Sequence, residues 1–400
     1  MSEANYKRIT LRPKKEDALL RFHPWVFSGA VATKDEGLVE GETVRVYTAA
    51  GNYIATGHYQ IGSIEVRVLT FRDEAITHDF WVKRLSVAYD LRKKIGVVSE
   101  HNNAYRLVHG EGDNLPGLII DVYGNTAVIQ SHSAGMHIDR MYICEALKEV
   151  LRGTLKNIYY KSETTLPYKA DLGQEDGYLW GGHADEVDEI AVENGLKFRP
   201  DWLKGQKTGF FVDQRDNRAL IEKYSSGRSV LNMFCYTGGF SFYAMRGGAK
   251  RVCSVDSSAK AIMLTENNVE LNFGNDPRHE SYAEDAFKFL GKINEGDYDL
   301  IVLDPPAFAK HRGAIRNALQ GYKRLNAVAF DKIAKGGILF TFSCSQVISK
   351  EAFRLAVFSA AAQSGRSVKI LHQLTQPADH PINIYHPEGE YLKGLVLYVE

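Results

Sequence analysis

The 400-residue sequence has few cysteines, no long apolar run and no net charge. Its four cysteines (Cys144, Cys235, Cys253 and Cys344) lie far apart and form no Cys-x-x-Cys pair. This spacing argues against a disulfide framework and against a cysteine zinc site, and it favours a reducing cytoplasm. No stretch approaches the roughly 18 apolar residues of a membrane span, and the charged N-terminus lacks the apolar core of a secretory signal. With 49 basic and 49 acidic residues, the total charge neither supports nor excludes a nucleic-acid partner.

Two small regions precede the largest part of the chain. Residues 1–75 show short apolar–polar alternations such as "ETVRVYTAAGNYIATGHYQIGSIEVRVLTF", which predict the strands of a small β-barrel. Residues 76–190 combine a helical stretch near 78–96, a hairpin signal at 123–126 and an amphipathic stretch at 138–152. These patterns predict a small central α+β domain, which ends in the acidic stretch 171–193.

The pattern changes in residues 191–400. "SVLNMF", "RVCSVD", "YDLIVLD" and "GILFTFS" are short, nearly continuous apolar runs separated by helical patterns. Strands of this kind are buried on both faces, and their alternation with helices indicates a doubly wound, mostly parallel, Rossmann-like sheet. The sequence therefore predicts a multidomain α/β protein.

Ligands of such sheets bind beyond the carboxyl ends of the strands, so the residues found there are the candidate site. The first run is followed by Gly238 and Gly239, which let a backbone approach a ligand closely. The second ends in Asp256, placed to accept hydrogen bonds from a ribose, and Asp285 lies where it can meet an adenine edge. The fourth ends in the rigid "DPP" turn at 304–306, and the fifth opens into "TFSCS". A dinucleotide site is disfavoured because the G-x-G-x-x-G fingerprint is absent.

These residues resemble a known family. The chain is similar to the bacterial large-subunit rRNA 5-methylcytosine methyltransferases, which join an N-terminal PUA domain to a class I S-adenosylmethionine (SAM) methyltransferase domain. The resemblance runs through "LRPKKEDALLRFHPWVFSGAV", "EGDNLPGLIIDVYGN", "GQKTGFFVDQRDNR", "LNMFCYTGGFS", "VDSS", "LDPPAFAK", "GYKRLN", "TFSCS" and "HPEGEYLKG". It implies a PUA-like RNA-binding domain at 1–75, a central domain at 76–190 and a SAM-dependent methyltransferase domain at 191–400.

The resemblance also implies roles for individual residues. The residues expected to hold SAM are Lys207, Gln214, Arg215, Phe234, Tyr236, Gly238, Gly239, Asp256, Asp285, Asp304 and Pro305. The residues expected to contact RNA are Lys14, Lys15, Arg21, Trp25, Phe308 and Lys323. For Trp25, a place in the barrel core is the alternative interpretation. The partner is expected to be large-subunit rRNA, with no membrane and no metal, and a homodimer is left open.

The candidate catalytic residues are Cys344 and Asp304. Because C5 of cytosine is a weak nucleophile, a thiolate must first add to C6, and a partly exposed cysteine at the sheet rim suits that step. Asp304 can bond N3 and the amino group of the base. Alternatively, Cys344 is a small core residue. The family's relatives outside this branch carry a second cysteine after the strand-four proline, but Pro306 is followed by alanine here, so the base that removes the C5 proton is not identified.

Two other functions stay open at this stage. The Asp304-Pro305-Pro306 turn also resembles the motif of enzymes that methylate an exocyclic amino group, although Phe308 comes one residue later than that motif requires. In that case Cys344 has no chemical role. From a different class, the chain is an RNA-binding ribosome assembly factor that has the fold but no activity.

Overall fold

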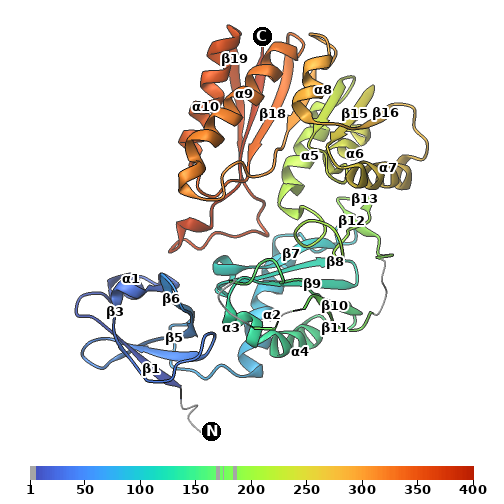
Figure 1. Ribbon diagram of the computed structural model, residues 1–400. Helices are drawn as coiled ribbons and strands as arrows, with labels where there is room; N and C mark the ends of the chain where they lie inside the picture. Colours follow the sequence, from blue (N-terminus) through green and yellow to red (C-terminus); the bar gives the residue numbers. More distant parts are fainter. Residues whose placement is uncertain (1–5, 168–171, 174, 183–186) are drawn as a thin grey trace. The chain divides into compact units, whose positions relative to one another are not determined.

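The computed structural model describes residues 6–167, 172–173, 175–182 and 187–400. Part of the predicted acidic stretch therefore lies outside the described residues. The chain divides into two compact units. One consists of residues 1–192, 200–212 and 378–389, and the other of 193–199, 213–377 and 390–400. Each unit is described by itself below (Figure 1).

The N-terminal part of the first unit is a six-stranded sheet in the order β2-β6-β5-β4-β1-β3. Its core consists of the alternate side chains of the strands, among them Ile9, Val44 and Val66, each 0% exposed. The strand-rich N-terminal region expected from the sequence is therefore present. Its elements are β1 (Lys7–Leu11), α1 (Asp17–Leu20), β2 (Trp25–Phe27), β3 (Val31–Lys34), β4 (Thr43–Tyr47), β5 (Tyr53–Tyr59) and β6 (Ile64–Thr70).

The rest of the first unit is built on a five-stranded sheet in the order β11-β10-β9-β8-β7. The predicted hairpin is confirmed: β8 and β9 pair antiparallel from Tyr123 opposite Thr126, and Gly124 takes φ 55° in the turn. The elements are α2 (His78–Lys94), β7 (Ala104–His109), β8 (Leu118–Tyr123), β9 (Thr126–Ser131), α3 (Ala134–Ile138), α4 (Arg140–Val150), β10 (Asn157–Tyr160) and β11 (Gly177–Trp180). A short hairpin, β12 (Ala191–Glu193) and β13 (Leu196–Phe198), follows along the chain.

The second unit is the predicted doubly wound α/β fold. Its seven-stranded sheet has the order β16-β15-β14-β17-β18-β20-β19. Six strands run in one direction, and β20 lies antiparallel between β18 and β19, an element the sequence patterns did not indicate. The strands are β14 (Ser229–Met233), β15 (Arg251–Asp256), β16 (His279–Ala283), β17 (Leu300–Leu303), β18 (Gly337–Ser343), β19 (Val368–Leu374) and β20 (Lys393–Val399).

Helices cover both faces of this sheet, so its central strands are buried. Helices α8, α9 and α10 pack in one layer, and α5, α6 and α7 in another (Figure 1). Every residue of β14, β17 and β18 is buried, which explains their continuous apolar sequences. The helices are α5 (Arg215–Tyr224), α6 (Gly239–Arg246), α7 (Ala259–Phe273), α8 (Ala286–Lys292), α9 (Ile315–Lys332) and α10 (Lys350–Ser364).

A buried ion pair holds the late segment 378–389 in the first unit. Arg92, 0% exposed, forms a bidentate pair with Asp113, and its Nη2 also donates to the carbonyl oxygen of Asp379 at 2.7 Å. The Asp379 carboxylate accepts a hydrogen bond from the Arg106 backbone at 3.0 Å. One arginine therefore satisfies a buried carboxylate and a buried carbonyl at once.

We expect Arg92→Met to destabilise the first unit by about 3–5 kcal/mol, because it leaves the buried Asp113 carboxylate without its counter-charge. The free energy of unfolding in urea, followed by circular dichroism, measures the effect. The matched control is Lys93→Met, which removes an exposed pair with Asp90 and a contact with the Tyr89 ring and is expected to leave the urea midpoint nearly unchanged. Equal midpoints for Arg92→Met and the wild type would contradict the assigned role.

Candidate active site

The sheet of the second unit brings several polar residues to one rim. Strand order reverses between β14 and β17, since the chain first builds β15 and β16 on one side and then β17 and β18 on the other. Such a switch point is where doubly wound folds bind ligands, beyond the carboxyl ends of their strands. Phe234, Asp256, Asp304 and Cys344 stand at or directly after the ends of β14, β15, β17 and β18, respectively.

The loop after β14 has an unusual backbone. Phe234 (φ 59°) and Tyr236 (φ 49°) adopt the left-handed conformation, as does Gly238 (φ 82°). A Cβ at Gly238 would lie 2.7 Å from the Cγ2 atom of Thr265, so only glycine fits there. Such conformations cost about 1–3 kcal/mol each for non-glycine residues and gather at functional sites. The loop leads directly into α6 at Gly239 and so presents backbone N–H groups at the rim.

Asp256 ties this loop to the next strand end. Its two carboxylate oxygens accept hydrogen bonds from the backbone N–H of Tyr236 at 3.0 Å and of Ser258 at 2.9 Å. The side chain is half-buried, and each oxygen keeps a further acceptor site. Asp285 is exposed and caps α8 through the N–H of Lys288 at 3.0 Å. Two backbone hydrogen bonds thus hold the Asp256 carboxylate at the rim, whereas the Asp285 carboxylate lies at the start of α8.

Asp304 is the most perturbed acid of the rim. Burial raises the pKa of its carboxyl to about 7, and the neighbouring Asp213 charge acts in the same direction. The Gln214 side chain opposes this by donating to Asp304 at 3.0 Å, and Gln214 is itself held by Asn217 at 2.6 Å. Asp213 accepts a hydrogen bond from the Tyr391 hydroxyl at 2.7 Å. Asp304 is therefore an oriented carboxyl group that titrates near neutral pH.

Two residues predicted to hold SAM, Arg215 and Lys207, lie in surroundings different from those of the rim residues. Arg215 is buried beside Glu193, with its Nε 3.8 Å from Oε2 of that residue. Glu193 also accepts two hydrogen bonds from Arg218, at 2.7 and 2.6 Å, and one from Tyr243 at 2.9 Å. The Arg215 guanidinium thus belongs to a buried ion cluster. Lys207 is exposed and belongs to the first unit, so its role toward SAM stays a prediction.

Cys344 differs from the other three cysteines. Cys144, Cys235 and Cys253 are buried, and burial raises the pKa of each thiol, to about 11 for Cys144 and about 12 for Cys253. Cys344 is partly exposed, directly after β18, and its Sγ lies 3.9 Å from the carbonyl oxygen of Pro305. The thiol therefore stands next to the Asp304-Pro305-Pro306 turn.

The residues predicted to contact RNA are divided between the units. Lys14, Lys15 and Arg21 are exposed in the first unit. Trp25 is half-buried there, with its Nε1 donating to Glu111 at 2.8 Å and its ring 4.3 Å from that of His386. In the second unit, the Phe308 ring packs 4.7 Å from Tyr322, and Lys323 is partly exposed on α9.

The described residues contain one cluster with metal-ligand chemistry, His23, His386 and Glu388, whose ligand atoms lie within 4.8 Å of one another. Both histidine rings pack against Trp25, and Glu388 is exposed. The cluster belongs to the first unit, as does Trp25. We interpret it as part of the surroundings of Trp25 and assign it no role in the chemistry of the rim.

Sequence reasoning missed three polar residues of the second unit. Asp213 and Tyr391 form the hydrogen bond that places a second acid near Asp304, and Lys393 lies beside Cys344. All three stand within sequence blocks that the resemblance marked, "GQKTGFFVDQRDNR" and "HPEGEYLKG". No local pattern assigns them a role, because their contacts join distant parts of the chain.

Comparison with known proteins identifies the family. Residues 166–388 match the model of S-adenosylmethionine-dependent methyltransferases, and residues 9–71 match a PUA-like domain. "Ribosomal RNA large subunit methyltransferase I" of Aeromonas hydrophila is 40% identical over 97% of this chain and 98% of its own length. The chain belongs to this family of SAM-dependent methyltransferases. The Tolumonas auensis protein of the same name is 42% identical, again over 97% of this chain and 98% of its own.

A solved structure has the same fold throughout. A SAM-dependent methyltransferase from Streptococcus mutans superposes with a TM-score of 0.82 at 22% identity, covering 98% of this chain and all of the other. The family assignment makes the chain an enzyme with SAM as its cofactor, and it confirms the N-terminal domain as PUA-like. It also favours the enzyme over a non-catalytic assembly factor. Among the described residues, no helix is both long and apolar enough to cross a membrane.

The raised pKa of Asp304 predicts how stability depends on pH. The folded-state pKa of about 7 lies above that of an unfolded aspartate, about 4, so the folded state binds this proton more tightly. The stabilisation is fully present below about pH 4 and is lost as the pH rises to about 7. Asp304→Asn removes this dependence.

Melting temperatures of the wild type and Asp304→Asn at several pH values measure the effect. The mutant should gain stability relative to the wild type between about pH 4 and 7, and the difference should then level off. Gln214→Met is the companion variant, since loss of its hydrogen bond to Asp304 should move the window to higher pH. Parallel pH profiles for all three proteins would show that Asp304 does not titrate as described.

Proposed function

We propose that this enzyme transfers the methyl group of SAM to C5 of a cytosine in large-subunit ribosomal RNA, in the cytoplasm. The names of its relatives support ribosomal RNA as the substrate. One observation supports the C5 chemistry above all. The only partly exposed thiol of the four cysteines lies at the sheet rim, 3.9 Å from the Asp304-Pro305-Pro306 turn.

Cys344 would act as the nucleophile. Its thiolate adds to C6 of cytosine, the C5–C6 double bond shifts its electrons to C5, and C5 takes the methyl group. Loss of the C5 proton to a base then restores the double bond and expels the thiolate. SAM supplies the methyl group when it is bound. A buried cysteine cannot reach a substrate, so Cys144, Cys235 and Cys253 are poor candidates for this role.

Asp304 would hold the base and a proton. As the thiolate adds to C6, negative charge develops on the ring and its N3 becomes basic. A carboxyl group with a pKa of about 7 carries a proton in a large share of molecules at neutral pH and can donate it toward N3. Gln214 donates a hydrogen bond to Oδ2 of Asp304 and so keeps the carboxyl group oriented. Removal of the C5 proton requires a separate base.

The rim fits the parts of SAM by the chemistry of its groups. Asp256 offers oxygens that can accept hydrogen bonds from both ribose hydroxyls, and Asp285 offers an acceptor for the adenine amino group. The N-terminus of α6 at Gly239 suits the carboxylate of the methionine part. Gln214 and Pro305, which belong to the same unit as the rim, complete the proposed set, while the roles of Lys207 and Arg215 toward SAM stay predictions.

The RNA would be held by charge and by the N-terminal domain. Lys14, Lys15 and Arg21 are exposed on the PUA-like domain and can contact phosphates, and Lys323 can do so near the rim. The Phe308 ring packs against Tyr322 of α9. A contact with the target base would be a second role for the same ring. The target cytosine must leave its stack to reach Cys344.

Cys344→Ala should bind SAM with unchanged affinity and lose methyl transfer by at least about three orders of magnitude, since the covalent step needs the thiolate. Unmodified large-subunit rRNA is incubated with SAM and each protein, and its nucleosides are analysed by mass spectrometry. Cys144→Ala, which removes a buried thiol of the first unit, is the control and should form 5-methylcytosine at the wild-type rate.

The same experiment separates the competing chemistries. If Cys344→Ala still forms the wild-type product, and above all if that product is an N-methylated base, the Asp304-Pro305-Pro306 turn acts without the thiol. Methylation of an exocyclic amino group would then replace the proposal. Failure of the wild type to methylate rRNA while it binds SAM would instead mean that the substrate is a different one.

Asp256→Ala should weaken SAM binding by about 1–3 kcal/mol, because hydrogen bonds to the ribose are lost. Titration calorimetry with SAM measures this change. Asp256→Asn distinguishes a loss of SAM affinity caused by a distorted loop from one caused by the lost carboxylate, since it keeps one oxygen for the backbone but loses the charge. Asp276→Ala is the distant control, because Asp276 pairs only with Arg278 at the sheet edge. Wild-type affinity in Asp256→Ala would mean that the ribose assignment is wrong.

A further inference from the structure

Lys393 is a buried lysine at the rim next to Cys344. It is the first residue of β20, and in the antiparallel register with β18 it lies opposite Ser343. Its side chain is 4% exposed, and its Nζ donates to the backbone carbonyl of Ser345 at 2.6 Å. Ser343 and Ser345 flank Cys344 in the chain. The ammonium group is thus bonded to the residue that follows Cys344, on a strand paired with the residue that precedes it.

A buried ammonium group needs a nearby negative charge, and the surroundings of Lys393 offer few. Burial lowers the pKa of Lys393 to about 8, whereas the charges of Cys344 and Glu390 favour its protonated form and Lys350 opposes it. Glu390 is engaged in an ion pair with Lys350 on α10. From α9, Tyr322 bonds the hydroxyls of Ser343 and Ser345. The Cys344 thiolate is therefore a natural counter-ion for Lys393.

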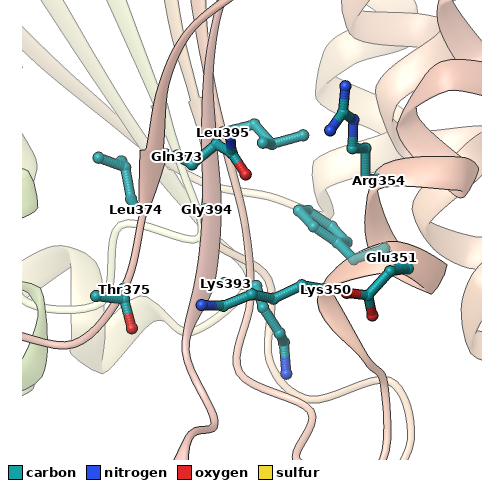
Figure 2. Close-up of a pocket in the computed structure, with 10 residues that line it drawn as sticks. Lys350, Glu351, Arg354, Gln373, Leu374, Thr375, Lys393, Gly394 and Leu395 are labelled. Carbon is teal, nitrogen blue, oxygen red and sulfur yellow. The ribbon is translucent and has the colours of Figure 1, made fainter.

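Lys393 also has a path for proton exchange. Figure 2 shows it among the residues lining a cavity of about 200 Å³ that α10 forms with β19 and β20. Lys350, Glu351 and Arg354 line the cavity from the helix, and Gln373 and Leu374 line it from β19. Charged and polar side chains line the cavity beside Phe353, Leu374 and Leu395, and the cavity is large enough to hold water next to the lysine.

We propose that Lys393 is a positioning residue that holds Cys344 as a thiolate for its attack on the base. In the neutral state of the pair the thiol gives its proton to the amine, so that Cys–SH and Lys–NH₂ become Cys–S⁻ and Lys–NH₃⁺. The ammonium group then stabilises the thiolate before attack and receives it again when the product leaves. This inference rests on the proposed function, in which Cys344 is the nucleophile.

The test measures the thiol directly, apart from methyl transfer. The rate of Cys344 alkylation by iodoacetamide is followed from pH 5 to 10 in the intact protein, by mass spectrometry of the peptide that contains it. In Lys393→Met the midpoint of this profile should rise by about one pH unit or more, because the stabilising charge is gone. Methyl transfer at pH 7 should fall about tenfold and recover as the pH rises, while SAM affinity is unchanged.

Three further variants complete the design. Lys393→Arg keeps the charge and should keep a midpoint near that of the wild type. Lys393→Gln removes the charge but can still donate to the Ser345 carbonyl, so it tests the proposal if Lys393→Met does not fold. Arg354→Met removes an exposed cation of the same cavity that is not among the charges acting on Lys393, and it should leave the alkylation profile unchanged.

The outcomes separate this inference from the proposed function. A wild-type alkylation midpoint in folded Lys393→Met or Lys393→Gln overturns the inference, whatever the activity. If Cys344→Ala still methylates RNA, the nucleophile assignment fails, yet the alkylation profile still decides whether Lys393 controls the thiol. An upward shift in both neutral variants, with none in Lys393→Arg, supports the inference.

Discussion

The parallel register of β14, β15, β17 and β18 is the constraint on which the candidate site depends. Parallel strands end at the same rim, so residues from separate strands of the sequence become neighbours there. Asp256 bonds the loop after β14, and the carbonyl of Pro305 lies beside Cys344. Without this register, the SAM residues and the thiol would have no common site.

The rim keeps several charged groups partly out of water, and this alters their acidity. Burial raises the pKa of Asp304 to about 7 and lowers the pKa of Lys393 to about 8. Both pKa values therefore lie close to neutral pH. Groups that titrate near the working pH can exchange protons with little driving force. The same burial that costs stability therefore gives the rim an acid and a base suited to proton transfer.

Buried charges with full partners have a different role. Arg92 with Asp113 in the first unit, and Glu193 with Arg218 in the second, are pairs with nearly complete hydrogen bonding. Each joins segments that are distant along the chain, such as Arg92 and the carbonyl of Asp379. Paired charges of this kind hold the scaffold in place, whereas the incompletely compensated charges lie at the rim where chemistry is proposed.

The sequence alone determined the doubly wound fold, the strand ends and most of the candidate residues. Continuous apolar runs show strands buried on both faces, and the polar residues directly after them, such as Asp256, Asp304 and Cys344, follow from the position of those ends. Only the tertiary structure placed Lys393 beside Cys344, Asp213 near Asp304, and Arg215 in an ion cluster with Glu193. The Lys393 contact spans 48 residues and depends on an antiparallel strand that enters the sheet from the end of the chain. Local patterns report which face of an element is buried, but they carry no information about which distant strand will lie next to it.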